Sequence, residues 1–483
     1  MNKNIFLLFF FFFFSLFSEE SYQIFSPKAI FSNDRLILKE KIELQHKLGQ
    51  ISAQSAEFEH FQLNKNNPFS NVLLQGDVRV LFISGGEIKS PRAYIDYLNN
   101  QIMFSSDSLE KTVCYTDIFQ SKEGKDLSLK ISSRQADVCI MDKKTLEKQK
   151  SIHNISILTF EKNVHIVFSD EYTFWGGKAL YLSKEKKETK KWGELSLFPE
   201  KNVNFCHFSS GDNTILASSI QVNIENKEII FNKAKGNISS FLGEQKNISF
   251  SSDNMFWDHF SRRLVMKGNV SLKEKDYCFL TAKKVELYQQ KGSSELAIQK
   301  IKTFGETEFF FIKEGEIISS LQCYGSIELD NNNKTFIAHA KKKRSPLAEK
   351  ILFRDKDIIL YADTAKVSYR QEEEFFRIDE IILQGEVLFI SQKIKDTLSF
   401  GIADKLTYLP TNKNLMLESL PQKKVLFWKD DDSLRLSANA IHVHCDDLTK
   451  KEAIKGIGSV RFSFNLEEEE FFHKIFSQYL GEK

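Results

Sequence analysis

Apolar and polar residues alternate in short stretches along most of the chain, and one pattern among them recurs. A small residue is followed three and five positions later by apolar or small side chains. In an extended chain, residues two positions apart point to the same face, so each copy predicts a strand with one buried face. The copies are Ala53-Ala56-Phe58, Ser90-Ala93-Ile95, Ser133-Ala136-Val138, Gly176-Ala179-Tyr181, Ser219-Val222-Ile224, Ser252-Met255-Trp257, Ala282-Val285-Leu287, Ala362-Ala365-Val367, Ala403-Leu406-Tyr408 and Ala438-Ile441-Val443.

These copies return at a nearly fixed spacing. Most starts lie 30 to 43 residues apart, whereas the step from Ala282 to Ala362 covers 80 residues and indicates a degenerate copy near Ser320. Repetition at such a period is typical of a stacked array of equivalent units rather than of a compact enzyme. The sequence therefore predicts tandem repeats of about 40 residues.

A second pattern, a turn followed by a valine, falls between these copies. Glycine or asparagine beside a β-branched residue is typical of a turn or bulge that leads into a strand. Each unit is therefore predicted to contain several short antiparallel strands joined by polar turns. The clear copies are Gly76-Asp77-Val78, Gly268-Asn269-Val270, Gly385-Glu386-Val387 and Gly458-Ser459-Val460, and the looser ones are Lys162-Asn163-Val164, Lys201-Asn202-Val203, Gly236-Asn237-Ile238 and Lys423-Lys424-Val425.

The two patterns define the predicted organisation of the chain. Repeats are expected over residues 25–340 and again over 350–465, with the second block continuous with the first. Between the blocks, a basic run from Lys341 to Arg344 meets Pro346. A long exposed hairpin or a joint between two repeat blocks is expected there, and a patch for an anionic partner is the alternative.

The two ends of the chain depart from the repeats. The apolar run from Ile5 to Phe17 follows Lys3 and is too short for a comfortable membrane span, so residues 1–18 are expected to be a signal peptide. An uncleaved anchor is the alternative, and the remainder is expected to be exported to the periplasm. Residues 466–483 have the spacing of an amphipathic helix with acids in its first turn. Its apolar face is expected to cap the last strand edge, or else to dock on a partner or membrane.

Composition narrows the choice of partners. The 483 residues include 67 Lys+Arg and 65 Asp+Glu, a net charge of +2, so no nucleic-acid partner is expected. A hydrophobic content of 41%, with 44 Phe, is ample for a large buried core. The cysteines are too sparse for a disulfide framework and are expected to be small buried residues, with one structural bridge as the alternative.

The paired patterns resemble those of the OstA/LptA-like family of lipopolysaccharide-transport proteins. The similarity is clearest from Tyr361 to Val387, from Gly401 to Tyr408 and from Leu73 to Val78. It implies an all-β fold, an elongated open β-jellyroll in which a V-shaped pair of antiparallel sheets encloses a groove for acyl chains. The chain is much longer than the family's single-module bridge, and it is expected to lack the barrel of the outer-membrane translocon that shares the module.

The same resemblance implies partners. Lipopolysaccharide or another lipid is the expected cargo, other envelope lipid-transport components are expected to take part, and sheet edges allow end-to-end self-association. No cofactor is expected.

The apolar positions of both patterns are the candidates for the lining of a lipid groove, and a sealed core between the sheets is the alternative. A lipid that crosses water must keep its tails out of solvent, at about 0.8 kcal/mol per exposed CH₂. A uniformly apolar trough favours movement of the tails over trapping. The candidates are Val270, Val285, Leu287, Ala365, Val367, Val387, Leu406, Tyr408, Ile441 and Val443.

Signals for chemistry are sparse elsewhere. Asp363 and Asp404 occupy equivalent repeat positions and are expected to be surface or turn residues rather than a catalytic pair. His442 and His444 share a strand face, but no obvious third or fourth ligand accompanies them, so no metal site is expected. The sequence contains no phosphate-binding loop, nucleophile elbow or zinc-protease motif, and the chain is not expected to be an enzyme.

The expected function is that of a periplasmic lipid-binding conduit or assembly factor that carries lipopolysaccharide to the outer membrane. The alternative is a structural or adhesive cell-envelope repeat protein without lipid cargo. An enzyme acting on envelope glycans is a third interpretation. A parallel β-helix is the rival fold, although its coils usually repeat at shorter periods.

Overall fold

The predicted strands can be compared with a computed structural model. The chain divides into two units: unit 1 comprises Met1–Ser210 and Ser218–Ile229, and unit 2 comprises Gly211–Ala217 and Ile230–Lys483. The structure describes residues 23–480, and the expected signal peptide, residues 1–18, lies outside the described residues. Further residues that are not described are 33–34, 47–48, 61–69, 84, 98, 100, 109–110, 122, 141–155, 186–190, 240–246, 275–277, 290–297, 343–345, 357, 372–375, 394–396, 413, 430–433 and 446–451.

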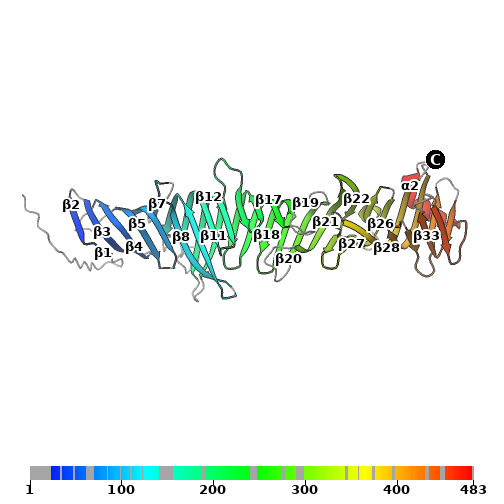
Figure 1. The fold of residues 1–483 in the computed structure, drawn as a ribbon, viewed down its shortest axis with the longest axis horizontal. Coiled ribbons are helices and arrows are strands. Elements are labelled where there is room, and N and C mark those ends of the chain that lie inside the picture. The colour runs from blue at the N-terminus through cyan, green and yellow to red at the C-terminus, as the bar shows by residue number, and fades with distance from the viewer. Residues whose placement is uncertain are drawn as a thin grey trace, which may run out of the picture. The chain divides into compact units, whose positions relative to one another are not determined.

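The strands of unit 1 pair in antiparallel fashion, mostly with their neighbours in sequence (Figure 1). They are β1 (Gln23–Phe25), β2 (Lys28–Ser32), β3 (Arg35–His46), β4 (Gly49–Glu59), β5 (Asn71–Phe82), β6 (Glu87–Asp96), β7 (Gln101–Ser105), β8 (Val113–Gln120), β9 (Asp126–Ser133), β10 (Gln135–Ile140), β11 (Ser156–Phe168), β12 (Tyr172–Glu185), β13 (Lys191–Phe198), β14 (Cys206–Ser210) and β16 (Ser219–Asn223).

Unit 2 has the same antiparallel pairing and ends in a helix, and the predicted all-β fold class is confirmed. Its elements are β15 (Asn213–Ala217), most of β17 (Glu228–Ser239), β18 (Asn247–Asp258), β19 (Arg263–Glu274), β20 (Cys278–Gln289), β21 (Ile298–Lys313), β22 (Glu316–Cys323), β23 (Ser326–Asp330), β24 (Thr335–His339), the 3₁₀ helix η1 (Leu347–Glu349), β25 (Ile351–Asp355), β26 (Ile358–Ala362), β27 (Thr364–Gln371), β28 (Phe376–Lys393), β29 (Thr397–Leu409), β30 (Asn414–Glu418), β31 (Val425–Lys429), β32 (Arg435–Ala438), β33 (Ala440–Cys445), β34 (Glu452–Ile457) and α2 (Leu466–Leu480).

Each unit is a ladder of rungs, where a rung is one passage of the chain through two sheets. In β5, residues 71–75 pair in one sheet and residues 78–81 in the other, and the register with both neighbouring strands shifts between the two halves. In unit 1 we call the sheet that contains residues 71–75 sheet A and the other sheet B. In unit 2 the register of β28 with β29 shifts between Gln384 and Val387, and there sheet A is the one with residues 381–384 and sheet B the one with residues 387–393. We call the point of crossing a corner. Other rungs are interrupted at the corner, as in β7 of sheet A and β8 of sheet B.

The corners of rungs that run from sheet A to sheet B carry the second sequence pattern. Gly76 and Asp77 have φ angles of 74° and 45°, and Gly385 and Glu386 have φ angles of 82° and 46°. Glycine adopts this left-handed backbone without the steric cost that other residues meet. The pair bends the strand into sheet B, where the following valine faces the interior.

One looser copy of this pattern does not form the predicted turn. Gly236 lies inside β17, where it pairs with Ile215 in the ladder. A Cβ at Gly236 would overlap the carbonyl oxygen of Thr214, so the glycine is required by a close backbone approach rather than by a turn.

The corners of rungs that run from sheet B to sheet A carry the first sequence pattern. Ala362 is buried where the two sheets meet, and Ala365 and Val367 follow it along the inner face of β27 in sheet A. Near the corner the sheets converge, so only small side chains fit between them. In β12 the inward side chains grow with distance from the corner, from Gly176 through Ala179 to Tyr181.

The two patterns meet in a single contact between neighbouring corners. In the first pattern a polar residue such as Asp363 follows the small residue, here Ala362. This polar side chain packs against the glycine of the second pattern at the next corner, and a Cβ at Gly385 would lie 2.8 Å from Oδ2 of Asp363. Hydrogen bonds accompany this contact, because Asn269 Nδ2 donates to Asp253 Oδ2 at 2.9 Å. Likewise, Gln54 Nε2 donates to Asp77 Oδ2 at 2.6 Å. A pair of consecutive corners therefore needs both sequence patterns.

Asp363 lies at the bend between β26 and β27, as expected of a turn residue, but its side chain is buried rather than at the surface. Its side chain is 9% exposed, and Nζ of Lys350, only 3% exposed, lies 2.8 Å from Oδ1. Asp404, at the equivalent corner, accepts the backbone N–H of Leu420 at 2.9 Å and pairs at 2.8 Å with the exposed Lys423. The same sequence position thus carries a buried ion pair at one corner and, at the other, a pair whose lysine is exposed.

An insertion lies at the corner of one rung, and its described residues are 340–342 and 346–350. β24 pairs with β23 and β27 in sheet A, and β25 pairs with β22 and β26 in sheet B. η1 lies between these two halves of the rung. Both sheets of unit 2 therefore continue past the insertion.

Asp363→Asn is expected to lower the free energy of unfolding by about 3 kcal/mol, because the buried Lys350 ammonium loses its nearer and buried carboxylate. Glu386 remains 3.4 Å from Lys350, but its side chain is 46% exposed. Asp404→Asn is the matched control and is expected to cost less than about 1 kcal/mol, since its partner is solvated. Urea denaturation of both variants at neutral pH measures the difference. Equal midpoints for the two variants would contradict the assignment of Asp363 to a buried pair.

Candidate functional site

The ten candidate groove residues all lie in unit 2 and all face the interior between its sheets. Their exposed fractions range from 0% to 7%. Eight of them belong to sheet A, and Val270 and Val387 are the first inward residues of sheet B after their corners. Candidates on the same strand are two residues apart, and side chains at this spacing point to the same face of a sheet.

Ladder pairing joins the eight candidates of sheet A into two inward rows that cross this sheet from β19 to β33. The row nearer the corners is Met266, Val285, Thr303, Ile327, Ala338, Ala365, Leu383, Leu406, Leu417 and Ile441. The second row is Leu264, Leu287, Ile301, Leu329, Phe336, Val367, Ile381, Tyr408, Leu415 and Val443.

These inward rows form a continuous apolar surface. Thr303 interrupts the first row, and its hydroxyl accepts a hydrogen bond from Thr307 at 2.9 Å. Tyr408 carries the one other polar group, at the outer end of its ring. The remaining members are hydrocarbon or thioether side chains, so the surface has nearly the same chemistry along its length.

Side chains of sheet B fill the space opposite these rows. Phe309 of sheet B contacts Phe336 of sheet A, with ring centroids 5.6 Å apart. Gly401 of sheet B makes room for Leu417, since a Cβ there would lie 3.1 Å from Leu417 Cδ1. The two sheets are therefore in direct contact through their inner faces.

A small cavity lies beside Leu287, between Trp257 and Ile298. Its volume is about 10 Å³, which is at the lower limit for one water molecule. An acyl chain is far larger, so it has room here only when side chains move or the sheets separate. The small volume favours a sealed core over an open groove in this state of the protein.

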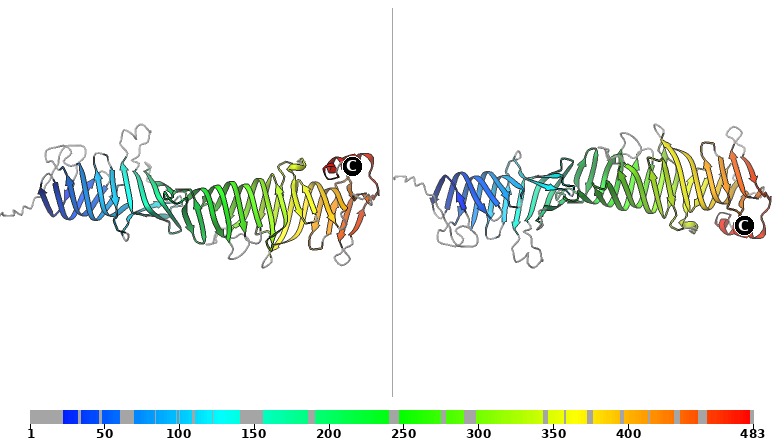
Figure 2. Two further views of the ribbon diagram at one scale, coloured as in Figure 1. Left: turned by 90° about the horizontal axis from the view of Figure 1, so that it is seen from above. Right: turned by 90° about the horizontal axis from the view of Figure 1, so that it is seen from below.

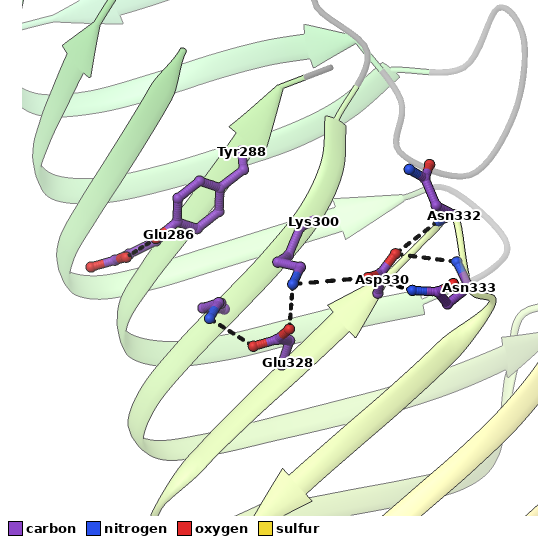
Figure 3. A network of polar contacts seen from close by, with 8 residues as sticks. Glu286, Tyr288, Lys300, Glu328, Asp330, Asn332 and Asn333 are labelled. Atoms are coloured by element: carbon purple, nitrogen blue, oxygen red, sulfur yellow. Dashed lines mark hydrogen bonds and ion pairs between the residues drawn. The ribbon is translucent and has the colours of Figure 1, made fainter. Parts of the chain in front are cut away.

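The outer face of sheet A in unit 2 carries a network of charged side chains (Figure 3). Glu286 accepts hydrogen bonds from Arg263 at 2.6 Å and from the Tyr288 hydroxyl at 2.7 Å, and Lys284 Nζ lies 2.7 Å from it. Glu328, two strands away, is held by Lys300 and by Lys302. Each carboxylate faces cations on its own or adjacent strands, which is the favourable cross-strand arrangement.

The network controls the acidity of its carboxylates. Burial by itself would raise the pKa of Glu286, but hydrogen bonds from Lys284, Tyr288 and Arg263 outweigh it and lower this pKa to about 2. The pKa of Glu328 is lowered in the same way, since burial is outweighed by Lys300 and Lys302. Because these cations are paired with acids, the face is a structural network rather than a site for an anionic ligand.

The low pKa of Glu286 predicts a loss of stability in acid. Glu286→Gln is expected to reduce the free energy of unfolding by on the order of 2 kcal/mol at pH 7. Since the folded-state pKa lies below the unfolded value, this contribution is complete above about pH 4.5 and is lost as the pH falls towards 2. Denaturation of wild type and variant between pH 3 and 7 measures it, with the more exposed Glu418→Gln as control. A difference that stays constant over this range would contradict the assignment.

The outer face of sheet B near the C-terminus is apolar and is covered by α2. Phe472 and Phe476 of the helix contact Phe400, with ring centroids 6.2 and 4.9 Å away. Figures 1 and 2 show the helix against the last strands of unit 2. The expectation that this helix caps the last strand edge is corrected by these contacts. The buried cluster is Tyr361, Leu388, Ile390, Phe400, Ile402, Leu426, Trp428, Phe472 and Phe476.

Polar contacts fix the start of α2. Asn465 Oδ1 accepts the backbone N–H of Glu468, and Glu468 accepts the backbone N–H of Asn465, each at 2.8 Å. This reciprocal pair satisfies two helix-end donors. Glu468 also pairs with Arg461 at 2.6 Å, and Glu469 pairs with Arg435 at 2.7 Å.

A signal for the covered face was present in the sequence. Residues 358–361, 387–390 and 425–428 are unbroken apolar runs, and a strand with unbroken apolar residues is buried on both faces. The alternation that marks the other strands is absent from these runs. They indicated that something covers the outer face, although they did not identify the covering element.

Phe476→Ala is expected to release α2 from sheet B, because a fully buried aromatic ring removed from a core costs about 3–5 kcal/mol. Limited proteolysis should then cut the variant within α2 at a higher rate than the wild type. Phe471→Ala is the matched control, since Phe471 is 43% exposed, and it should leave the rate within about twofold of wild type. Equal protection of α2 in both variants would rule out this packing.

The two histidines that the sequence offers as metal ligands, His442 and His444, both lie on β33. His444 contacts Asn414, and Asp446 and Asp447 are outside the described residues. Among the residues that the structure describes, no group of three or more His, Cys, Asp or Glu is placed to hold a metal ion.

Cys114, Cys139, Cys206, Cys278 and Cys323 are free thiols. Burial raises the pKa of the Cys206 thiol to about 12, so it stays protonated, and Cys323 is also buried. Cys139 is exposed, which differs from the expectation that the cysteines are small buried residues.

The helical part of the described chain contains no segment with the length and apolar character needed to cross a membrane.

No protein-family model matches the chain. No curated protein matches it either. Among solved structures, the chain is similar to LptH, the LptA homologous periplasmic component of the conserved lipopolysaccharide transport device from Pseudomonas aeruginosa. The two share 14% sequence identity with a TM-score of 0.21, over 27% of this chain and 80% of that chain.

Proposed function

We propose that this chain is a periplasmic lipid-binding conduit or assembly factor that carries lipopolysaccharide, or another lipid, to the outer membrane between its two sheets. The observation that carries the proposal is the pair of inward rows in sheet A of unit 2. They run through successive rungs with Thr303 as the one polar interruption near the corners. The ten candidate residues are proposed as part of the lining.

The chemistry of these rows suits the movement of acyl chains. Each CH₂ that leaves water gains about 0.8 kcal/mol, so a tail between the sheets is held by its length rather than by one contact. Because successive rungs present similar side chains, a shift of one rung changes the contact energy little. The sugar head groups stay in water on the side of the hairpin turns, which lies opposite the corners.

The packed interior favours a second candidate, a structural or adhesive cell-envelope repeat protein without lipid cargo. The cavity beside Leu287 holds about 10 Å³, and the inner faces of the sheets are in contact. Under the lipid proposal the sheets part when cargo enters, with the corners as the fixed side. Under the alternative they stay closed.

Transport between two membranes also requires partners. We propose other envelope lipid-transport components for this role, together with end-to-end contact between copies through exposed strand edges. Such an edge pairs with a new strand by backbone hydrogen bonds and needs no specific side chain.

A photoreactive phenylalanine analogue placed at Val367 or at Leu406 is expected to form adducts with lipopolysaccharide upon illumination, because both positions face the interior. The same residue at Lys366 or Thr407 is the matched control, since these neighbours point to the outer face. Mass spectrometry of the illuminated protein identifies the adducts.

Substitution of Leu406 by Asp should prevent loading while the far-UV circular dichroism of the β-structure is retained, since a carboxylate in the row repels hydrocarbon. Equal adducts at inward and outward positions, or none at either, would favour the structural alternative.

A further inference from the structure

Unit 1 contains a carboxylate inside its apolar interior. Asp117 lies on β8 between Tyr115 and Phe119, and the three side chains face inward, with Asp117 5% exposed. A carboxylate withdrawn from water is costly unless hydrogen bonds replace its hydration. Asp117 must therefore be held by donors inside the unit.

Donors reach Asp117 from both sheets. Tyr115, on the same strand, donates its hydroxyl to Oδ2 at 2.7 Å, and the backbone N–H of Ile118 donates to Oδ1 at 2.8 Å. Tyr181, on the sheet A half of β12, donates its hydroxyl to Oδ2 at 3.2 Å. The bond from Tyr181 therefore connects sheet A to sheet B across the interior.

The surroundings are shaped around these hydroxyl groups. The ring of Tyr181 lies 5.4 Å from that of Tyr115 and 6.3 Å from that of Phe119, measured between centroids. A Cβ at Gly86 would lie 2.7 Å from the Tyr115 hydroxyl, and a Cβ at Gly193 would lie 2.8 Å from Cε2 of Tyr181. Both glycines are therefore required by the space that the two tyrosines occupy.

The position of the bond within the rung gives it a mechanical role. Tyr181 is the last residue of the pattern Gly176-Ala179-Tyr181, so it lies away from the corner, and Asp117 lies towards the hairpin turn after β8. At the corner the sheets are joined by the continuous chain and cannot separate. Only the side of the hairpin turns can open, and the bond from Tyr181 to Asp117 spans that side. An ion pair between two hairpin turns spans it as well, since Nζ of the buried Lys227, after β16, lies 3.2 Å from Oε2 of the half-exposed Glu171, between β11 and β12.

We propose that Tyr181 and Asp117 form a latch that holds the open side of unit 1 shut, and that cargo enters unit 1 only after this hydrogen bond breaks. The identity of the cargo, an acyl chain, rests on the proposed function, whereas the latch itself does not. A hydrocarbon tail offers no donor to Asp117, so the tail cannot replace the hydroxyl of Tyr181. Passage of a tail therefore requires Asp117 to keep its remaining donors and turn towards water.

Tyr115 is suited to stay with Asp117 when the latch is open. Burial raises the pKa of Tyr115 well above its usual range, with further contributions from Tyr181 and Asp117, so its hydroxyl keeps the proton. Both of these donors, Tyr115 and Ile118, lie on β8 and move with Asp117. Of the three hydrogen bonds to Asp117, the one from Tyr181 joins the two sheets, and it is the one that breaks on opening.

Tyr181→Phe tests the latch, because it removes the hydroxyl and retains the ring. In the full-length protein without lipid, amide hydrogen exchange in β8 and in the sheet A half of β12 is expected to rise about tenfold, the effect of losing one hydrogen bond to a charged group. Tyr408→Phe, at the equivalent repeat position in unit 2, is the matched control and should leave exchange in β8 and β12 unchanged. Asp117→Asn is a second variant and should raise exchange in the same strands.

Unchanged exchange in both unit 1 variants, or an equal rise in every strand of unit 1, would overturn the latch. The first result removes the mechanical role, and the second indicates only a general loss of packing.

Labelling by lipopolysaccharide with photoreactive acyl chains separates the latch from the proposed function. Tyr181→Phe is expected to acquire label in unit 1 about tenfold faster than wild type. Equal labelling rates despite faster exchange would show that the bond does not limit entry, and this part of the proposal would be wrong. Faster exchange with no labelling of any variant would support the latch and count against lipid carriage.

Discussion

Each rung must cross from one sheet to the other while its backbone groups stay paired, and this requirement shapes both units. Rungs in one direction meet it with a left-handed pair such as Gly385 and Glu386. Rungs in the other direction use a small residue and a polar one, such as Ala362 and Asp363, which pack on the neighbouring corner. Since the directions alternate, the repeat of about 40 residues corresponds to two rungs.

The corner also determines the shape of the interior. Small side chains fit where the sheets converge and larger ones fill the space farther away, which gives a wedge with an almost wholly apolar lining. The convergence of the sheets does not restrict the side chains on their outer faces, and the two outer faces differ in polarity. In unit 2, one outer face carries the ion pairs around Glu286 and Glu328, whereas the other is apolar and lies under α2.

A wedge that is joined along its corners can open only on the side of its hairpin turns. Contacts such as that of Phe309 with Phe336 close this interior in unit 2, and in unit 1 the hydrogen bond from Tyr181 to Asp117 adds a polar connection. An acyl chain can replace the apolar contacts between side chains at little cost in free energy. It cannot replace a hydrogen bond, because a hydrocarbon has no donor or acceptor. The proposed conduit thus has interior surfaces that yield to lipid and, inside unit 1, a hydrogen bond that resists it.

Local sequence rules were enough for the all-β class, for the corners and for the inward direction of Val367 or Leu406, because a strand alternates every two residues and glycine tolerates left-handed backbone. The burial of Asp363 beside Lys350, the docking of α2 on the outer face, and the bond between residues 117 and 181 were decided by tertiary structure. Each depends on which distant surfaces meet. A period of two specifies the faces of a strand, but it contains no information about the partner that each face contacts.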